Sequence, residues 1–449
     1  MDHTDVLRDS SVAVVVTYAP AGLGHLRVAD ALIDGLPEGV HPVLMRAEEQ
    51  YTQRLHRYFS VTRFTRWISV WFQHGLQEEL FTRAYIRLLR LTARNLYRSV
   101  ETVLNEQNGF PKTVLFVSTH YALAHQLSAI KEGIITRYGL RVLLVVQVTD
   151  DSPQLMWYVP GADCIVVPSD RTKTSLLRYS QKRHLPEVNI VVAPYPISEK
   201  FRIELSQNGR DRSDQLSSDS SVPIHVAIPV SGAAVGLSFA RDLMLSLHRV
   251  SDRYYFHVVS KHSSQTKSLL AELSVIPFVT THSAQHDKDI VNVYETLYEH
   301  VVVGLEVTKP SEQSFKALCT PRERGGSILL FSDPVGKQEW DNLDFLERHD
   351  LLPDNTMQKI LWKLSERGDD VDQEVLTRAL RWRGLRLPSH PSVASRFIHW
   401  SLTQQLFSQM ANCALRPMVA DAHKHELNSS GVEVFWDVVR NLIRSVSSK

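Results

Sequence analysis

The stretch "VVVTYAPAGLGHLRVADAL", residues 14–32, joins a buried strand to a helix through a loop of small residues. Its opening valines form an uninterrupted apolar run, which is typical of a short strand covered on both faces in a parallel sheet. After His25, apolar residues recur at the spacing of a helix that packs on that sheet. Gly22 and Gly24 predict a tight turn that leaves backbone N–H groups open at the helix N-terminus, where anions bind. The stretch predicts an α/β unit with a ligand loop; a tight turn that binds nothing is the alternative.

Strand-like and helical stretches then alternate along both halves of the chain. Four runs in the first half have the composition of buried strands: 113–118, 141–148, 164–167 and 189–193. Residues 224–245, "IHVAIPVSGAAVGLSFARDLML", repeat the opening pattern of strand, small-residue loop and helix. Further strands are predicted at 255–259, 300–303 and 327–331. This alternation predicts two Rossmann-like domains, each with a mostly parallel sheet.

A polar segment separates the two halves. Residues 205–223, "LSQNGRDRSDQLSSDSSVP", are rich in Ser and Asp and nearly free of large apolar side chains, which is typical of a linker. The predicted parts are an N-terminal domain, a linker, a C-terminal domain and a helical extension: 1–204, 205–222, 223–365 and 366–449. A closing helix near 432–446 is expected to pack back onto the body of the protein.

The composition is that of an ordinary soluble globular protein. Hydrophobic residues make up 43% and charged residues 22% of the 449 residues, and the net charge of +1 does not indicate a nucleic-acid binder. Three cysteines without a CxxC pair argue against a zinc site or a disulfide framework and favour a reducing compartment. The longest apolar runs have strand length, short of a membrane span. We therefore expect a cytoplasmic protein without a metal centre.

Six motifs, in their order along the chain, resemble those of the GT-B glycosyltransferases. They are GxGH after the first strand, "STH" at 118–120, "VTDDSPQLMW" at 148–157, the second Gly/Ser loop, "TKPSEQSFKAL" at 308–318 and "GKQEWDNLDFL" at 336–346. The nearest groups are the monogalactosyldiacylglycerol synthases, the processive diacylglycerol glucosyltransferases and the lipid-linked N-acetylglucosaminyltransferase of peptidoglycan synthesis. The resemblance implies an α/β GT-B fold, with two Rossmann-like parallel-sheet domains that face a cleft. The N-terminal domain would bind the acceptor and the C-terminal domain a UDP-sugar.

On the acceptor side, the resemblance places Gly22, Gly24 and His25 at the floor of the cleft. The unperturbed pKa of a histidine lies near neutrality, so His25 can take a proton from an attacking hydroxyl. Asp150 matches the family's TD aspartate, a second base candidate or an orienting partner of the histidine. His120 matches a family histidine at a strand end and would bind acceptor; a histidine satisfied within the fold is the alternative.

On the donor side, the second small-residue loop would receive the diphosphate at a helix N-terminus. Lys309 would supply a point charge to phosphate, and the equivalents of Gln338 bind sugar hydroxyls in the family. Asn342 lies four residues after Gln338, hence on the same face of a helix. The predicted donor residues are Ser231, Gly232, Gly236, Lys309, Glu312, Gln338, Glu339 and Asn342. An ordinary amphipathic helix start is the alternative for the last three.

Two departures from the family pattern concern the donor motif and the "VTD" stretch. The family reads PGG…T..EA, with a glutamate that grips the ribose, but here both glycines are absent from 310–317. The glutamate position holds Lys316 or Ala317, and Glu312 is the substitute from a shifted position. Gln154 stands where the family has a histidine. The departures predict a different donor or acceptor, or weakened transferase chemistry.

A row of arginines lies apart from these motifs. Arg83, Arg87, Arg90, Arg94 and Arg98 are spaced to line one stripe of a helix. Upstream, residues 54–72 mix arginines with Phe and Trp. A basic, aromatic surface suits anionic lipid headgroups or a lipid-linked acceptor, and we assign Arg83 and Arg87 to acceptor binding. A solvated helix face with core aromatics is the alternative.

Together these features predict a metal-independent glycosyltransferase that moves a sugar from a nucleotide-sugar, a substrate and not a cofactor, to a lipid or lipid-linked hydroxyl. Helix N-termini and Lys side chains can stabilise the departing diphosphate without a metal. The expected partners are the donor, the lipid acceptor and an anionic membrane surface at the inner face of the cell membrane, with no nucleic acid. Two alternatives stay open. One is an enzyme similar to UDP-N-acetylglucosamine 2-epimerase; the other is a degenerate GT-B protein that binds nucleotide or membrane without turnover.

Overall fold

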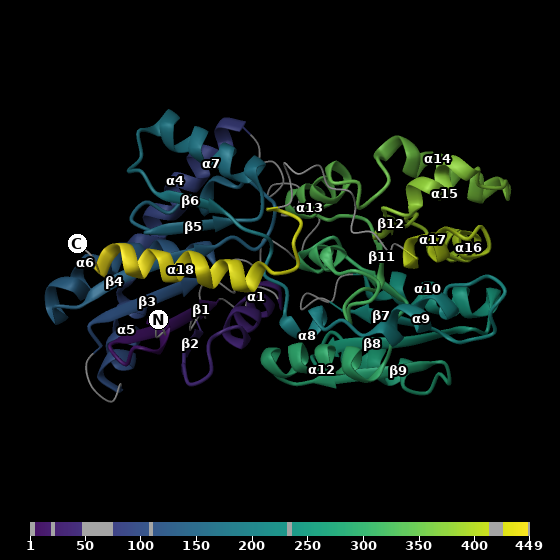
Figure 1. Cartoon of the computed structure of the whole chain (residues 1–449), viewed down its shortest axis with the longest axis horizontal. Helices are drawn as coiled ribbons and strands as arrows, with labels where there is room; N and C mark the ends of the chain where they lie inside the picture. Colours follow the sequence, from purple (N-terminus) through teal and green to yellow (C-terminus); the bar gives the residue numbers. More distant parts are fainter. Residues whose placement is uncertain are drawn as a thin grey trace. The chain divides into compact units, whose positions relative to one another are not determined.

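The chain forms two α/β units, each around its own sheet, in a computed structural model (Figure 1). The structure describes residues 5–18, 23–46, 75–106, 111–230, 236–412 and 425–447. The first unit comprises Met1–Ser198 together with Ser430–Lys449, and the second comprises Glu199–Ser429. Each unit has a hydrophobic core on its own sheet, as a chain too long for a single core requires.

The sheet of the first unit has six parallel strands in the order β2-β1-β3-β4-β5-β6. They are β1 (Val12–Tyr18), β2 (Val43–Arg46), β3 (Thr113–Ser118), β4 (Arg141–Gln147), β5 (Cys164–Val167) and β6 (Asn189–Val192). Strands β3 and β5 have the predicted bounds, and β4 and β6 each end one residue before the prediction. Strand β2 was not predicted, because four residues beside a loop carry little periodicity.

Helices cover both faces of this sheet. They are α1 (Leu23–Asp34), α4 (Gly75–Leu91), α5 (Arg94–Glu106), α6 (Tyr121–Tyr138) and α7 (Asp170–Arg183), with the short 3₁₀ turns η1 (Val6–Arg8) and η2 (Leu155–Trp157). Helix α7 begins at Ser169, whose hydroxyl accepts a hydrogen bond from the backbone N–H of Thr172. Helix α6 ends at Gly139, whose φ of 62° lies in the left-handed region. Both boundaries therefore follow from the capping residues in the sequence.

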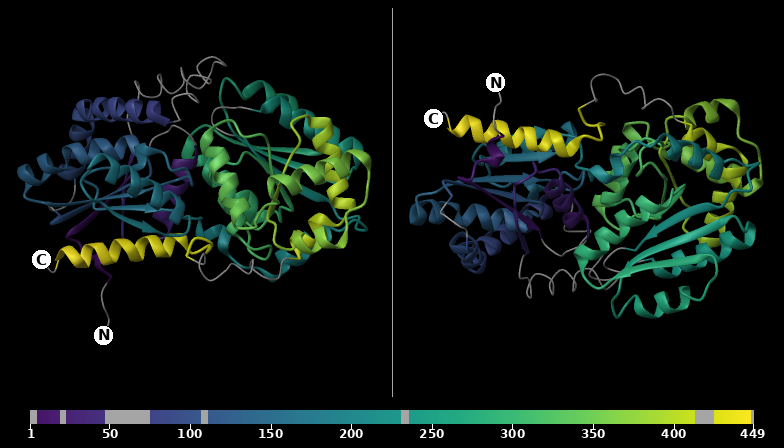
Figure 2. Two further views of the ribbon diagram at one scale, coloured as in Figure 1. Left: turned by 90° about the horizontal axis from the view of Figure 1, so that it is seen from above. Right: turned by 60° about the horizontal axis from the view of Figure 1, so that its bottom comes forward.

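Helix α18 (Gly431–Ser447) returns to the first unit from the far end of the chain and lies along it, drawn in yellow in Figure 2. The buried Trp436 donates through Nε1 to the carbonyl of Leu32 at 2.8 Å. Arg440 forms an ion pair with Asp5 at 2.8 Å. These contacts fasten α18 to α1 and η1, in agreement with the closing helix that the sequence predicts.

The sheet of the second unit also has six parallel strands, in the order β12-β11-β10-β7-β8-β9. They are β7 (Ile224–Pro229), β8 (Tyr254–Lys261), β9 (Val279–Ala284), β10 (Leu305–Thr308), β11 (Ile328–Phe331) and β12 (Gly384–Arg386). The strand predicted at 300–303 is wrong: His300 ends a helix, and the strand begins only at Leu305. Strands β9 and β12 were not predicted, and β12 lies inside the segment expected to be helical.

The helices of the second unit are mostly those that the apolar periodicity indicates. They are α8 (Glu199–Arg202), α9 (Ser206–Gln215), α10 (Leu237–Val250), α11 (Lys267–Leu273), α12 (Asp287–His300), α13 (Lys337–Arg348), α14 (Asn355–Arg367), α15 (Gln373–Ala379), α16 (Pro391–Thr403) and α17 (Leu406–Ala411), with the 3₁₀ turn η3 (Glu312–Leu318). Helix α16 packs on α10 and contributes the buried Phe397 and Ile398 to the core. The segment after 366 therefore completes this unit's core up to α17.

The polar segment 205–222 is structured where the sequence indicates a linker. Residues 206–215 form α9, and the segment belongs to the second unit. The buried Arg212 donates to the backbone carbonyls of Val303, Pro321, Glu323 and Arg324. Burial lowers the pKa of this guanidinium to about 10. A single arginine that donates hydrogen bonds to four carbonyls holds the helix in place without apolar side chains. The hydropathy pattern therefore does not indicate this helix.

The two six-stranded parallel sheets, one in each unit, confirm the predicted α/β class with two Rossmann-like domains. None of the helices in the described part of the chain is apolar over a length that would cross a bilayer.

Candidate functional site

The strand order of each sheet marks the place where a ligand is expected. In an open parallel sheet, ligands bind at the carboxyl ends of the strands where the strand order reverses. In the first unit this switch point lies between β1 and β3, and in the second between β7 and β10. The candidate residues His25 and His120 follow β1 and β3, while Gly236 and Lys309 follow β7 and β10. These four candidates therefore lie at the two switch points.

His25, in the first turn of α1, is held by the loops that follow the neighbouring strands. Its Nδ1 lies 2.7 Å from the carbonyl oxygen of Thr119 and 3.2 Å from the hydroxyl of Thr149. Because a carbonyl can only accept, Nδ1 carries the proton, and Nε2 is the basic nitrogen of the neutral ring. The Thr119 hydroxyl in turn donates to the backbone carbonyl of His25 at 2.9 Å. The ring is therefore fixed in the tautomer that a general base at Nε2 needs.

Aromatic rings surround His25. The ring of His120 meets it edge-on, with centroids 4.8 Å apart. Tyr121 stacks on His120 at 4.7 Å, and Trp157 meets Tyr121 edge-on at 5.6 Å. His120 is buried and precedes α6. The structure thus brings the candidates His25 and His120 together and adds two aromatic rings, Tyr121 and Trp157, the last residue of the 148–157 motif. Gly24 lies next to His25 in α1, and Gly22 lies outside the described residues.

The two neighbouring aspartates after β4 have different surroundings. Asp150 is half-buried in the turn that follows Thr149, the residue that contacts His25. Asp151 is fully buried and accepts hydrogen bonds from the hydroxyls of Ser169 and Thr172, at the start of α7. Asp151 therefore anchors the turn that carries Thr149 and Asp150. The sequence analysis missed this role, although the paired aspartates were a signal that one of them could be structural.

A second buried anchor is His125 in α6. Its Nε2 donates to the carbonyl of Met156 at 3.0 Å and thereby holds the turn η2, which carries Trp157. Burial lowers the pKa of His125 to about 4, so the ring is neutral at physiological pH. Gln154, the residue that departs from the family pattern named above, is buried at the start of the same turn. Its burial identifies it as part of the turn's packing.

In the second unit, Gly236 precedes α10 with a φ of 86°. This left-handed conformation favours glycine, and among the described residues no other atom lies within 4 Å of the position that a Cβ would occupy. Helix α10 has 14 residues, so its N-terminus carries open N–H groups at the switch point of this sheet. Ser231 and Gly232 lie outside the described residues.

The predicted residues of α13 divide into two groups. The fully buried Asn342 donates to the carbonyl of Pro310 at 3.1 Å, and Glu339 accepts from the backbone N–H of Val335 at 2.7 Å. These two side chains bind the protein's own backbone, so they position the loop after β10 and the start of α13. Gln338 is half-buried in the first turn of α13, and Lys309 is half-buried directly after β10. The last two are therefore partly accessible to solvent.

Lys316, which with Ala317 is one of the two residues that the resemblance aligns with a ribose-binding glutamate, is buried in a polar cluster. Its Nζ lies 2.6 Å from Glu306 Oε2, 2.7 Å from the Tyr294 hydroxyl and 2.6 Å from the Tyr298 hydroxyl. Burial lowers the pKa of Lys316, and the ion pair with Glu306 opposes this effect. The neighbouring Ala317 is buried as well. Glu312, the acidic candidate of this motif, is half-buried at the start of η3.

Helix α4 presents apolar side chains on its outer face. Leu80, Leu88 and Leu91 are 64%, 51% and 76% exposed, whereas Glu79 and Thr82 are buried on the inner face. Lys182 and Arg183 pair with the buried Glu79. The single helix predicted for the arginine row is wrong, because α4 ends at Leu91 and α5 begins at Arg94. All five arginines are exposed, three on α4 and two on α5: Arg83, Arg87, Arg90, Arg94 and Arg98. The aromatic segment 54–72 lies outside the described residues.

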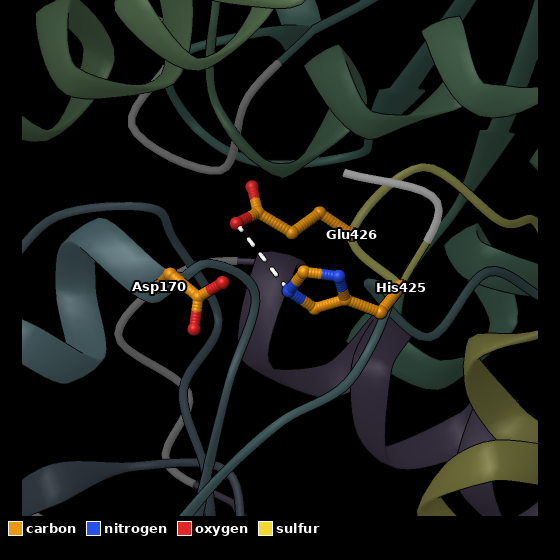
Figure 3. A group of neighbouring side chains, drawn as sticks. All are labelled: Asp170, His425 and Glu426. Atoms are coloured by element: carbon orange, nitrogen blue, oxygen red, sulfur yellow. Dashed lines mark ion pairs between the residues drawn. The ribbon is translucent and has the colours of Figure 1, made fainter. Parts of the chain in front are cut away.

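The segment after residue 425 carries a buried carboxylate beside two histidines. His349 Nε2 donates to Glu426 at 2.9 Å, and both side chains are only 3% exposed. His425 Nε2 lies 3.9 Å from the other oxygen of Glu426 (Figure 3, dashed line). Asp170, also labelled there, belongs to the first unit as the first residue of α7. The pair with His349 fastens this segment to α13.

Neither a protein-family model nor a curated protein matches this chain. Among solved structures, a UDP-glucosyltransferase from Polygonum tinctorium capable of glucosylating indoxyl is 12% identical, with 96% of this chain and 98% of that chain covered and a TM-score of 0.46. MurG from Acinetobacter baumannii is 12% identical over 96% and 99% of the two chains, with a TM-score of 0.44. UDP-GlcNAc 2-epimerase from Neisseria meningitidis, bound to UDP-GlcNAc, is 10% identical over 95% and 99%, with a TM-score of 0.41. Likenesses at this level do not indicate the substrate of this chain.

Proposed function

We propose that this protein is a glycosyltransferase that moves a sugar from a nucleotide-sugar, UDP-linked, to a hydroxyl of a lipid or lipid-linked acceptor. The observation that carries the proposal is His25. A histidine in a fixed tautomer, at the switch point of a parallel sheet, is what a hydroxyl-activating base requires.

In the proposed reaction, Nε2 of His25 takes the proton of the acceptor hydroxyl. The oxygen then forms a bond to the anomeric carbon of the sugar while the bond from that carbon to the diphosphate oxygen breaks. The imidazolium that results is stabilised by the Nδ1–H bond to the Thr119 carbonyl. Asp150, in the same loop as Thr149, is the second base candidate or an orienting group.

For the donor, we propose the switch point of the second unit. The sheet order there, with β7 in the middle, is that of dinucleotide-binding proteins. The N-terminus of α10 at Gly236 would receive the diphosphate, and Lys309 would add a positive charge. Gln338 would contact the sugar and Glu312 the ribose. Asn342 and Glu339 would hold Lys309 and Gln338 in place through their backbone contacts.

The lipid part of the proposal rests on α4. An ordinary surface helix turns its leucines inward, but here three leucines face outward while a glutamate and a threonine are buried. Arg83, Arg87 and Arg94 are exposed on the same helix and on the start of α5. Leucines that enter the headgroup region and arginines that attract anionic headgroups suit binding at a membrane surface. The protein would then work at the inner face of the cell membrane.

Lys316 favours a second candidate, a GT-B protein that binds nucleotide without turnover. Its ammonium group is committed to Glu306 and two tyrosines, so this position offers the ribose no carboxylate. An enzyme similar to UDP-GlcNAc 2-epimerase would differ from both, because it converts a UDP-sugar without an acceptor.

The test begins with calorimetry against UDP-, GDP- and dTDP-sugars, followed by transfer of a radiolabelled sugar to total lipid extract. The transferase predicts binding of one donor and label in the lipid phase. His25→Ala should keep donor affinity and lower turnover by roughly 10²–10⁴-fold, the usual contribution of a general base. His41→Ala, which removes an exposed histidine in the same unit, is the matched control.

Three other results would each reject the transferase. If the protein binds a donor but no label appears in a glycolipid, in a water-soluble product or in an epimerised sugar, the protein without turnover is favoured. Conversion of the UDP-sugar in the absence of lipid would favour the epimerase. Millimolar donors that release no heat would reject nucleotide-sugar binding altogether.

A further inference from the structure

Three histidines form a continuous chain of imidazole rings across the second unit's sheet. Nδ1 of His225 lies 3.0 Å from Nε2 of His257, and Nδ1 of His257 lies 3.2 Å from Nε2 of His282. The three residues stand on β7, β8 and β9, which are neighbours in the sheet (Figure 1). Neither the sequence motifs nor the proposed transfer reaction uses them.

The strand register places the three rings on one face. Ala227 pairs with His257, and Val259 pairs with His282, so each histidine is offset by two residues from the next and all three share a side of the sheet. The alternate residues Val226 and Phe256 point to the opposite side, into the hydrophobic core. Tyr255, on the histidine side, is 41% exposed. The row therefore lies on a face that solvent reaches at its two ends, where His225 and His282 are half-buried.

We propose that this histidine row is a binding site for one divalent transition-metal ion, such as Zn²⁺, Ni²⁺ or Cu²⁺, with His257 and one flanking histidine as ligands. Nitrogens bound to one such ion at 2.0–2.1 Å lie roughly 2.9–3.4 Å apart, for coordination angles between a right angle and a tetrahedral one. Both nitrogen pairs already have this separation. The site is independent of the proposed transfer reaction.

The third histidine has a defined task in this arrangement. With the ion on His225 Nδ1 and His257 Nε2, the protons of these rings sit on His225 Nε2 and His257 Nδ1. The latter proton is donated to His282 Nε2, along the contact that the structure shows. A metal-bound histidine commonly donates its other N–H to such a partner, which fixes the tautomer and the ring orientation.

The row predicts one ion and not two. Both nitrogen pairs share His257, and a second ion would require that ring to lose both of its protons. The outer rings are separated by the whole middle ring and by both contacts, so they cannot chelate an ion without His257. His257 is therefore indispensable, whereas His225 and His282 can replace each other as the second ligand.

The experiment is a titration of the full chain with Zn²⁺ and Ni²⁺ by calorimetry at pH 7.5, with Mg²⁺ as the ion that imidazoles do not favour. His257→Gln and the double variant His225→Gln/His282→Gln should each lose one bound ion. His225→Gln and His282→Gln alone should keep that ion with about 10- to 100-fold weaker affinity, because the orienting hydrogen bond is gone. His390→Gln, an exposed histidine of the same unit, should bind as the unmodified protein does.

Two measurements distinguish a variant that has lost the metal site from one that has lost its fold. The melting temperature of each variant is measured without metal, and zinc-edge anomalous diffraction from crystals of the unmodified protein locates the ion directly. A peak between His257 and a flanking ring supports the proposal. It is overturned if the unmodified protein binds no Zn²⁺ or Ni²⁺, if His257→Gln binds as many ions as before, or if the anomalous peak lies elsewhere.

Discussion

At the scale of single residues, side chains of the same chemical type take different roles because their burial and their hydrogen-bond partners differ. Asp151 is tied to two hydroxyls inside the first unit, while Asp150 next to it is half-buried beside the loop that holds His25. Asn342 and Gln338 likewise share a helix face, yet Asn342 is fully buried and donates to the Pro310 carbonyl, whereas Gln338 is half-buried. A buried polar side chain must find a partner within the protein, so of two such candidates the less buried one is the one that solvent can reach.

The neutral His125 makes stability depend on pH. Its folded-state pKa, about 4, lies below the usual 6.5, so the stability of its buried neutral form is fully present above pH 6.5. As the pH falls from 6.5 toward 4, the unfolded chain takes up a proton that the folded ring refuses. We expect this residue to cost up to about 3 kcal/mol of the free energy of unfolding over that range.

Urea unfolding at a series of pH values measures this slope. His125→Gln keeps an N–H donor for the Met156 carbonyl but cannot titrate, so its free energy of unfolding should fall less steeply below pH 6.5. His41→Gln, at an exposed site, should follow the unmodified protein. Equal slopes for His125→Gln and the unmodified protein would contradict the prediction.

The buried pair of Lys316 and Glu306 should behave as a coupled unit. Lys316→Met leaves the Glu306 carboxylate buried without its cation, which should cost about 3–5 kcal/mol of the free energy of unfolding. The double variant Lys316→Met/Glu306→Gln removes both charges and keeps an oxygen acceptor for the two tyrosines. It should therefore be more stable than Lys316→Met alone.

Urea unfolding of the four proteins in this double-mutant cycle measures the coupling. Lys200→Met is the matched control, since it breaks an ion pair with Glu295 whose lysine is 41% exposed, and it should cost less. Additive effects of the two substitutions would show that Lys316 and Glu306 act independently.

At the scale of elements, α4 differs from an ordinary surface helix because its outer face carries exposed leucines. Reversing Arg83, Arg87 and Arg94 to Glu should abolish sedimentation with anionic liposomes at low salt, since each arginine near an anionic surface contributes about 1 kcal/mol. Nucleotide-sugar binding should be unchanged, because its proposed residues lie in the other unit. The matched control reverses Lys359, Lys363 and Arg367, which are exposed on α14. Unmodified protein that ignores anionic liposomes would rule out the docking surface.

Elements with strong periodicity were predictable from the sequence, and those fixed by contacts far along the chain were not. The valine-rich β1 and the runs of β3 and β5 are dominated by apolar residues, so hydropathy indicates these strands. Helix α9 was not predicted, because it is attached to its unit by one buried arginine and not by a stripe of apolar side chains. The three-residue β12 is defined by its pairing with β11 and has almost no local pattern.

The candidate site was predictable to a similar extent. His25 and His120 were predicted and do meet, because the carboxyl ends of adjacent parallel strands lie at one edge of a sheet. The anchors Asp151 and His125 were not predicted, since burial and a carbonyl partner in a distant loop leave no trace in residue spacing.

At the scale of the whole molecule, the second unit is one continuous segment, whereas the first is completed by residues from the end of the chain. Residues 199–429 carry their own core, so this segment expressed alone should fold cooperatively and retain nucleotide-sugar binding. Residues 5–198 alone lack α18, and should unfold at a lower temperature than the same segment joined to 430–447 by a flexible linker. Thermal unfolding and calorimetry of the three products measure both effects. A segment 5–198 as stable as its α18-linked form would show that α18 contributes little.

The return of α18 also sets an order of events during synthesis. A ribosome makes residues 5–198 first, but Trp436, which caps the carbonyl of Leu32, emerges only after the whole second unit has been translated. The first unit therefore cannot complete its fold until α18 has been made, and the surface that α18 covers stays exposed until then. The second unit, although it is made later, can complete its fold earlier. A premature stop after the second unit and before α18 would leave the first unit without its last helix. Chaperones and proteases would act on this product, because the surface that α18 normally covers is exposed.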